Sequence, residues 1–139
     1  MNPLLQIMLV DDDRVFNSES TKIIRENGIT NCVKTALNGG HAILLLDQIY
    51  SDLRNKKLLI LLDPQMPIMD GIEFLKHYSK CNHPFKKNIS IAFMVTPETS
   101  DEVIDEAKSL GIYHFLNKPL SLTALKEVLG DTQKFEKVA

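Results

Sequence analysis

The chain has few of the features that mark nucleic-acid-binding, membrane or redox proteins. Its 139 residues carry a formal net charge of −2 and no basic block, so no basic surface for nucleic acid is expected. No apolar run approaches the roughly 20 residues that span a bilayer, and residues 1–13 lack the pattern of a secretory signal. Cys32 and Cys81 lie outside any CxxC pair, which fits a reducing compartment. We therefore expect a cytoplasmic protein with neither nucleic acid nor membrane among its partners.

The chain also lacks the common phosphate-binding loops, because neither GxGxxG nor GxxxxGK(S/T) occurs. Its length and its shares of hydrophobic (44%) and charged (24%) residues are ordinary for one globular domain. We assign residues 1–131 to this domain and residues 132–139 to a C-terminal tail. The four histidines, whose spacing predicts surface or capping roles rather than metal binding, are His41, His77, His83 and His114.

Short apolar runs alternate with amphipathic stretches five times. The predicted strands are residues 6–10, 32–36, 58–62, 89–95 and 113–116, of which 58–62 is aliphatic enough to be central. Helices are predicted at residues 14–27, after Gly40, at residues 71–78, after Ser100 or Asp101, and after Ser121. Residues 79–88 are predicted to form a polar loop, and Val15 to face the core from the first helix. Such alternation predicts a parallel sheet with right-handed crossovers and helices on both faces.

Polar side chains follow four of these strands, at the point where each apolar run ends. Asp11 and Asp12 follow the first strand, and Asp63 follows the third. Thr96 follows the fourth strand and Lys118 the fifth. Residues just past the strand ends of an open parallel sheet line one shared crevice, so these segments should converge. Three carboxylates, a hydroxyl and an ammonium suit a divalent cation together with a phosphoryl group.

Four sequence fragments, each at the end of its own strand, identify a family resemblance. They are VDDD at residues 10–13, LLDPQMPIMDG at 61–71, MVT at 94–96 and FLNKP at 115–119. With them the chain resembles response regulator receiver domains of the CheY-like type, the phosphoacceptor modules of two-component signalling. The resemblance implies a flavodoxin-like (βα)5 fold, a doubly wound three-layer sandwich with strand order 2-1-3-4-5. It also suggests a stand-alone receiver, since no output domain fits after Ala139.

The resemblance assigns a phosphoacceptor and a Mg²⁺ site. Asp63 would be the phosphoacceptor, since a carboxylate can attack phosphorus when a cation offsets its charge. Mg²⁺ would be bound by Asp12 and Asp63, by Asp11 through water, and by the backbone carbonyl of Gln65. These are hard oxygen ligands of the kind that Mg²⁺ prefers. The alternative, that residues 11–13 only cap the first helix, would explain one aspartate but not the matching Asp63.

The resemblance also assigns roles to the remaining residues of the crevice. The hydroxyl of Thr96 and the ammonium of Lys118 would each bind a phosphoryl oxygen. The Lys118–Pro119 bond is cis in the family. Phe115 matches the family's aromatic switch position, coupled to Thr96, although plain core packing explains Phe115 equally well. The phosphoryl group would come from a histidine kinase or a histidine phosphotransfer protein, and altered contacts with an unknown downstream protein would carry the signal.

Two prolines depart from the family pattern. Pro64 and Pro97 occupy positions where receivers donate backbone N–H groups to phosphoryl oxygens, and proline has no N–H. We therefore expect Asp63 to be phosphorylated more slowly or with an altered lifetime. Gln65 and Glu98 fall at positions that tune how water reaches the acyl phosphate, and they could either position or block that water.

Three other functions compete with the phosphoacceptor interpretation. A degenerate receiver that docks without phosphorylation is suggested by the two prolines. A phosphatase that forms an aspartyl phosphate would need a second acid–base aspartate where Gln65 stands. A flavodoxin-like flavin carrier would need a glycine- and hydroxyl-rich phosphate loop where residues 11–13 place three aspartates. We therefore expect a signalling domain rather than an enzyme.

Overall fold

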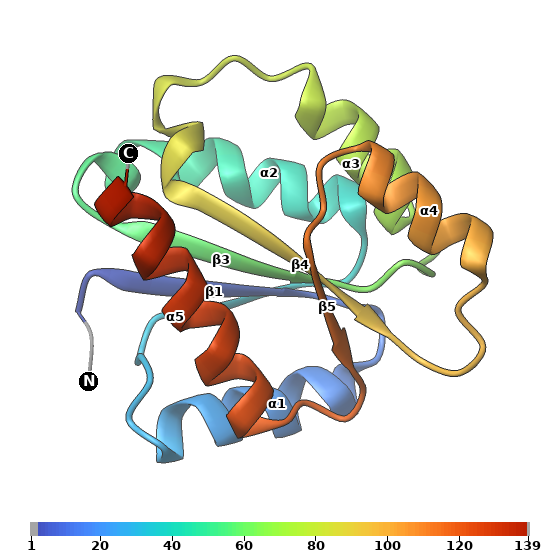
Figure 1. Ribbon diagram of the computed structural model, residues 1–139, viewed down its shortest axis with the longest axis horizontal. Helices are drawn as coiled ribbons and strands as arrows, with labels where there is room; N and C mark the ends of the chain where they lie inside the picture. The colour runs from blue at the N-terminus through green and yellow to red at the C-terminus, as the bar shows by residue number, and fades with distance from the viewer. Residues whose placement is uncertain (1–2, 139) are drawn as a thin grey trace.

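The fold is built on a five-stranded parallel sheet. The computed structural model describes residues 3–138, with side chains described over residues 3–130. The strands are β1 (Leu5–Val10), β2 (Val33–Ala36), β3 (Lys57–Leu62), β4 (Ile89–Val95) and β5 (His114–Asn117). They are hydrogen-bonded in the order β2-β1-β3-β4-β5, which confirms the predicted order (Figure 1). The aliphatic strand β3 is central, also as predicted.

Helices cover both faces of the sheet and complete the predicted three-layer sandwich. The α-helices are α1 (Arg14–Glu26), α2 (Gly39–Ile49), α3 (Gly71–Ser79), α4 (Asp101–Ser109) and α5 (Leu122–Val138). Figure 1 shows α1 and α5 on one face and α2, α3 and α4 on the other. Two 3-10 helices, η1 (Tyr50–Arg54) and η2 (Pro84–Asn88), precede β3 and β4 respectively.

The helix η2 corrects the prediction that residues 79–88 form only a polar loop. Pro84 begins this short helix, where a missing N–H costs nothing. Nδ1 of His83 accepts a hydrogen bond from the backbone N–H of Phe85 at 3.2 Å and so caps it. The ring of His83 stacks on Tyr50, with 4.0 Å between the ring centroids. His83 therefore has the capping role predicted for the histidines. The helix that it caps was not predicted, because the polar residues of this segment are typical of a loop.

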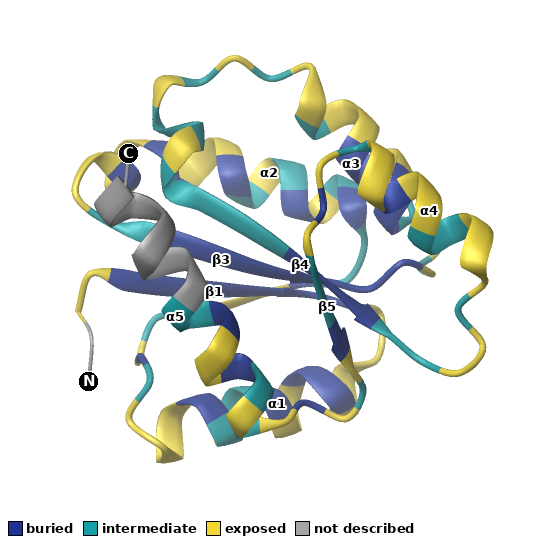
Figure 2. Cartoon of the chain, in the orientation of Figure 1, coloured by how far each residue is buried: buried dark blue, intermediate teal, exposed yellow. Residues whose placement is uncertain are grey.

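The strands β1 and β3 form the centre of the core and are buried on both faces (Figure 2). Alternate residues face opposite layers, as the twofold period of a strand requires. Met8 and Ile60 belong to the cluster that packs against α2 and α3, whereas Leu9 and Leu61 belong to the cluster that includes residues of α1 and α5. These buried strands hold the residues that follow Val10 and Leu62 in fixed positions.

The helix α1 turns a different face to the core from the predicted one. Its buried residues are Phe16, Asn17, Ser20 and Ile24. Val15 was predicted to face the core, but its side chain is 65% exposed. The prediction was wrong because positions 16, 20 and 24 define the buried stripe, and Val15 lies about 100° around the helix from Phe16. The helix ends as predicted, with Gly28 at a φ of 68° just beyond it.

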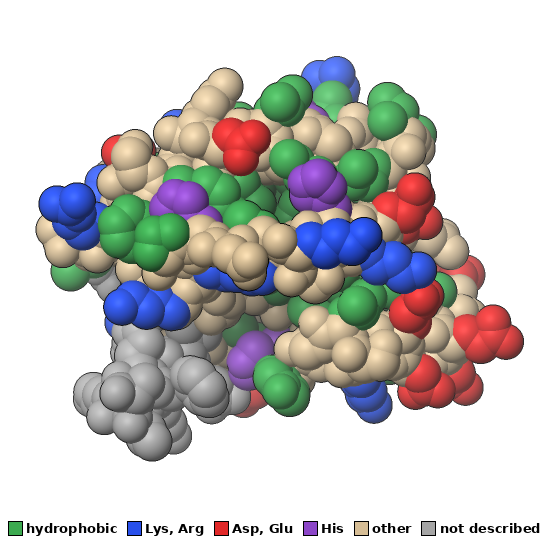
Figure 3. Space-filling view, turned by 90° about the horizontal axis from the view of Figure 1, so that it is seen from above, with side chains coloured by type: hydrophobic (Ala, Val, Ile, Leu, Met, Phe, Trp, Pro, Cys, Tyr) green, Lys and Arg blue, Asp and Glu red, His purple; other side chains and the backbone are tan. Residues whose placement is uncertain are grey.

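The backbone of α5 extends to Val138, and the division into a domain of residues 1–131 and a tail of residues 132–139 stays a prediction. Within residues 3–138, no helix has the length and apolar character needed to cross a membrane. Figure 3 looks onto the layer of α2, α3 and α4 and shows acidic side chains gathered toward the end where α4 lies.

Candidate functional site

Asp11 and Asp63 are brought together by two neighbouring parallel strands. Val10 and Leu62 are paired in register at the ends of β1 and β3. The backbone N–H of Asp63 donates to the carbonyl of Val10 at 2.9 Å, and that of Asp11 donates to Ala36 in β2 at 3.0 Å. Each aspartate is therefore held by the last backbone hydrogen bond of its strand. Carboxylate oxygens of Asp11, Asp12 and Asp63 lie within 4.8 Å of one another.

The three consecutive aspartates occupy three different environments. Asp11 is buried, with only 2% of its surface exposed, and its Oδ1 accepts the backbone N–H of Asp13 at 2.9 Å. Asp12 is exposed and contributes a carboxylate to the cluster. Asp13 caps α1 by accepting the backbone N–H groups of Val15 and Phe16 at 3.0 and 3.1 Å. Capping therefore accounts for Asp13 alone and leaves Asp11 and Asp12 to the cluster.

Lys118 supplies the positive charge of the cluster. Its Nζ lies 2.5 Å from Oδ2 of Asp11 and 3.4 Å from Oδ1 of Asp63, and its side chain is 20% exposed. Nζ also lies 4.6 Å from the centroid of the Phe16 ring, in cation–π geometry. The backbone N–H of Lys118 donates to Val95 at the end of β4, and the peptide bond to Pro119 is cis. The ammonium is thus positioned by β4, β5 and α1.

Burial and crowding perturb the ionisation of the site. Burial and the nearby Asp11 carboxylate raise the pKa of Asp63 to about 6, although Lys118 and a hydrogen bond from the Gln65 backbone oppose the shift. Asp63 is therefore still mainly ionised at pH 7. Burial lowers the pKa of Lys118, but the hydrogen bond to Asp11 and the charges of both carboxylates outweigh burial and raise it. Three carboxylates with one ammonium leave the cluster net negative, which favours a divalent cation.

Thr96 lies at the end of β4 and is half-buried. Its hydroxyl oxygen accepts the backbone N–H of Glu98 at 3.2 Å, which leaves the hydroxyl hydrogen free to donate. The backbone N–H of Thr96 donates to the hydroxyl of Thr99 at 3.0 Å, and Thr99 donates back to the carbonyl of Thr96. Among the described residues no hydrogen bond joins Thr96 to the aspartates. Thr96 directly follows β4, the strand that pairs with β3, at the end of which Asp63 lies.

Phe115 is a half-buried residue of β5. Its ring meets that of Phe93 edge-on, with 6.2 Å between centroids, and the ring lies 5.8 Å from Nζ of Lys108 in α4. These contacts belong to the core cluster on the side of α2, α3 and α4. Both the switch role and plain packing are compatible with this position, since the ring of Phe115 is only half-buried but still packs against neighbouring side chains.

The loop after Asp63 is fixed to the site by close backbone packing. The N–H of Gly71 donates to the carbonyl of Pro64 at 3.1 Å. A Cβ at position 71 would lie 2.7 Å from the carbonyl oxygen of Asp63 and 2.9 Å from Cα of Pro64, so only glycine fits. Asp70 and Glu73 form a capping box that begins α3 at this point. Pro64 is itself buried, and Gln65 is exposed beside Asp63.

Three supporting residues were not identified from the sequence. The buried Asn17 donates from Nδ2 to the carbonyl of Asp11 at 2.9 Å and so braces the end of β1. Phe16 was predicted to be a core residue but also lies against Lys118. Thr99 closes the turn after Thr96. The only available signal was weak: Asn17 is a polar residue on the buried stripe of a helix.

The donor set of the cluster fits a magnesium ion. Three carboxylates can each present an oxygen within one small volume, and Asp12 is exposed to water, which Mg²⁺ retains on binding. No histidine or cysteine belongs to the described cluster, so a softer metal is not favoured.

Comparison with known proteins places this fold and site in a class. A family model described as the response regulator receiver domain matches residues 7–130. The chain therefore belongs to the receiver domain family of two-component response regulators. Receiver domains are signalling domains that bind Mg²⁺ at an acidic pocket, and this chain has a cluster of three aspartates that could hold such an ion.

Individual relatives agree with this assignment. A two-component response regulator from Cytophaga hutchinsonii has a TM-score of 0.81 at 22% identity, covering 96% of this chain and 99% of its own. Chemotaxis protein CheY4 from Vibrio cholerae has a TM-score of 0.73 at 26% identity, covering 93% and 98%. A protein-glutamate methylesterase/protein-glutamine glutaminase from Treponema denticola is 28% identical over 91% of this chain. The chain spans 33% of that relative's length, so the name describes a larger protein.

Proposed function

We propose that this receiver domain is a phosphoacceptor that takes a phosphoryl group on Asp63. The observation that carries the proposal is that Asp63 lies 3.4 Å from the Lys118 ammonium and within 4.8 Å of the Asp11 and Asp12 carboxylates. The ammonium offsets part of the negative charge of the nucleophile, and the two carboxylates supply sites for a divalent cation.

The residues have distinct roles in the transfer. Bound Mg²⁺, held by Asp12, Asp63 and the Gln65 carbonyl, with Asp11 acting through water, would neutralise charge on the phosphoryl oxygens. A carboxylate oxygen of Asp63 attacks phosphorus, the new O–P bond forms, and the bond from phosphorus to the donor breaks with its electrons leaving on the donor. The Lys118 ammonium and the Thr96 hydroxyl each bind a phosphoryl oxygen. The buried position of Asp63 limits access of water to the acyl phosphate.

The partners follow from the same proposal. A histidine kinase or a histidine phosphotransfer protein would donate the phosphoryl group, and a downstream protein would recognise the modified surface. Phe115 would carry the signal if its half-buried ring turned inward with Thr96 after phosphorylation. Its contact with Lys108 ties such a movement to the surface of α4.

Intact-mass measurement tests the proposed function. Incubation of the protein with acetyl phosphate or phosphoramidate and Mg²⁺ should add the mass of one phosphoryl group. The same incubation with EDTA should add none, because the carboxylates would then repel the donor. A protein that gains no mass under both conditions would contradict the proposal.

Asp12 provides a test of the metal site that does not depend on phosphorylation. We expect Asp12→Asn to weaken Mg²⁺ binding by at least about tenfold, or about 1.4 kcal/mol, as measured by isothermal titration calorimetry. Because Asp12 is exposed, its replacement should leave the midpoint of thermal unfolding of the metal-free protein nearly unchanged. The matched control is Asp52→Asn, an exposed aspartate in η1 outside the cluster. Equal Mg²⁺ affinity in the two variants would remove Asp12 from the metal site.

Pro97 provides a test of the missing backbone donor. Pro97 is exposed, so Pro97→Ala should restore an N–H next to Thr96 without leaving a cavity. We expect phosphorylation by acetyl phosphate to become several-fold faster, within the roughly hundredfold effect of one well-placed donor. Pro84→Ala, at the start of the remote η2, controls for the loss of a proline. An unchanged rate in Pro97→Ala would show that this donor does not limit the reaction.

The same prolines favour one competing function, docking without phosphorylation. Pro64 and Pro97 together remove two N–H groups, and the N–H of Gln65 already hydrogen-bonds the Asp63 carboxylate. Such a protein would bind Mg²⁺ in calorimetry yet show no response to beryllofluoride, a phosphoryl mimic. Mg²⁺ binding combined with a beryllofluoride-induced change in the Phe115 resonances would instead favour the phosphoacceptor.

A further inference from the structure

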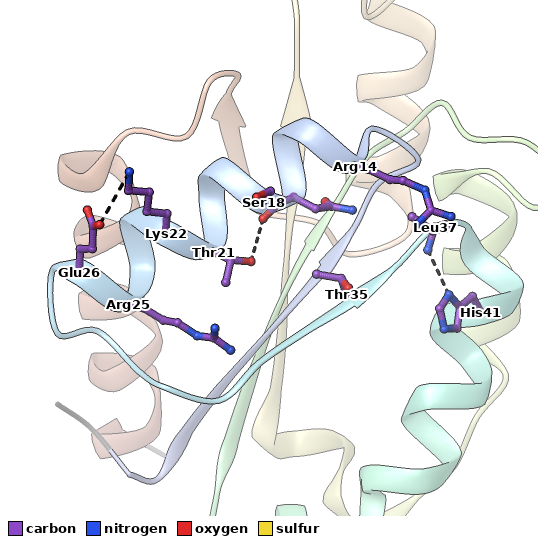
Figure 4. A pocket seen from close by; sticks show the side chains of 10 residues that line it. Arg14, Ser18, Thr21, Lys22, Arg25, Glu26, Thr35, Leu37 and His41 are labelled. Carbon is purple, nitrogen blue, oxygen red and sulfur yellow. Dashed lines mark hydrogen bonds and ion pairs between the residues drawn. The ribbon is translucent and has the colours of Figure 1, made fainter.

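A groove lies at the edge of the sheet, away from the aspartate cluster. Its volume is about 690 Å³, and it extends from α1 across β2 to the start of α2. The strand β2 is the edge of the sheet and has a partner strand on one side only. Thr35 of β2 is exposed and lines the groove, as does Leu37, which follows the strand (Figure 4). The groove therefore gives access to an unpaired strand edge.

Basic side chains of α1 border this groove. Arg14 points toward Leu37 and His41, and Arg25 points toward the strand that carries Thr35 (Figure 4). Lys22 also borders the groove but lies 3.9 Å from Glu26 in an exposed ion pair. Neither arginine has an ion-pair partner among the described side chains. The groove thus has two unpaired guanidinium groups in a chain whose net charge is −2.

Asn17 forms part of the wall of the same groove. The residue is 4% exposed and lines the groove, and its Nδ2 is held by the carbonyl of Asp11. Its Oδ1 is buried and has no hydrogen-bond partner. Because this oxygen is enclosed by the protein, Asn17 contributes to the wall of the groove and not to ligand binding.

We propose that this groove binds an extended acidic segment of a partner protein, which lies along the β2 edge. Carboxylates of the segment pair with Arg14 and Arg25, and its backbone amides pair with the free edge of β2. Arg14 and Arg25 are separated by about three turns of α1, or about 16 Å at about 1.5 Å per residue. Side chains four residues apart on one face of an extended chain are separated by about 13 Å, so two acidic residues can reach both arginines.

The chemistry of the groove favours a peptide over other anions. A simple anion such as phosphate would pair with the guanidinium groups but would not pair with the strand edge. An acidic peptide carries both carboxylates for the guanidinium groups and backbone N–H and C=O groups for the edge of β2. Nucleic acid would require a larger basic surface than two arginines and one paired lysine provide.

Fluorescence anisotropy with two labelled peptides tests the proposal. The probes are an eight-residue peptide of alternating glutamate and threonine and its lysine–threonine counterpart. We expect the wild-type protein, without phosphorylation, to bind the acidic peptide and not the basic one. Charge reversal in the double variant Arg14→Glu/Arg25→Glu should weaken acidic-peptide binding by at least about tenfold. Both arginines are outside the aspartate cluster, so the outcome does not depend on phosphorylation of Asp63.

A second pair of basic residues gives a matched control. Lys80→Glu/Lys87→Glu makes the same change in net charge on exposed residues of the opposite layer. Its affinity for the acidic peptide should remain within about twofold of wild type. In ¹⁵N spectra the amide of Thr35 should shift and gain protection from hydrogen exchange when the peptide binds.

Three outcomes would overturn the proposal. The first is equal weakening by both double variants, which would indicate non-specific charge attraction. The second is full displacement of the peptide by an equal concentration of inorganic phosphate, which would indicate a simple anion site. The third is a Thr35 amide whose resonance and exchange rate do not change, which would show that the peptide does not pair with the edge of β2.

Discussion

Asp63→Asn will leave the protein unable to gain phosphoryl mass from acetyl phosphate in the presence of Mg²⁺. The amide retains the shape of the side chain but removes the nucleophilic oxygen charge, so the O–P bond cannot form. The loss should be complete, and intact-mass spectrometry after the reaction measures it directly. Asp11, the other carboxylate beside Lys118, already accepts a hydrogen bond on each oxygen, from the Asp13 N–H and from Lys118.

Unfolding should not account for this loss. Burial and the Asp11 carboxylate raise the pKa of Asp63, which means that the folded protein disfavours the ionised form. A neutral amide relieves that unfavourable charge, so the thermal midpoint of metal-free Asp63→Asn should equal or exceed that of wild type at pH 7. Asp52→Asn, in the exposed helix η1, should still gain one phosphoryl group. Phosphoryl mass on Asp63→Asn would locate the acceptor elsewhere.

Gly71→Ala should destabilise the protein and slow phosphorylation together. The added methyl group would lie 2.7 Å from the Asp63 carbonyl oxygen and 2.9 Å from Cα of Pro64, both backbone atoms that cannot rotate away. Forcing a group into such a packed site costs about 1–3 kcal/mol, measurable by urea unfolding. Any relief must move the backbone that carries Asp63, and a displacement of about 1 Å can cost on the order of a hundredfold in rate.

Gly130→Ala is the matched control for the added methyl group. A Cβ at position 130 meets nothing within 4 Å, and Gly130 lies inside α5, where alanine is the better helix former. We expect this variant to be as stable as wild type or more stable by up to about 1 kcal/mol, with an unchanged rate of phosphorylation. Equal stability of the two alanine variants would show that the contact at Gly71 relaxes without cost.

The sequence predicted the sheet and the convergence of the aspartates because both depend on one regular feature. Apolar runs such as residues 58–62 are too short for a typical helix and are typical of buried strands, and parallel strands place their ends at one edge. Asp11 and Asp63 are therefore neighbours by topology alone, before any side-chain detail is known. Ser100 and Ser121, which cap α4 and α5, were predictable for a similarly local reason.

The remaining contacts depend on side-chain directions that no periodicity encodes. The exposure of Val15 follows from how α1 is rotated about its axis, which the buried polar residues Asn17 and Ser20 help to set. The direct ion pair between Lys118 and Asp11 joins residues 107 positions apart and depends on the rotamers of both. The groove at β2 depends on the directions of Arg14 and Arg25, which sequence patterns leave open on an exposed helix face.

The three consecutive aspartates, Asp11 to Asp13, have different roles and cannot replace one another. Removing Asp13 should loosen the first turn of a helix, removing Asp12 should cost an ion, and removing Asp11 should leave an ammonium without its nearest counter-charge. Each loss would register in a different assay, and neither remaining aspartate could move into the vacated role. Substitution at any one of the three positions should therefore impair a separate property of the protein, even though the residues are identical.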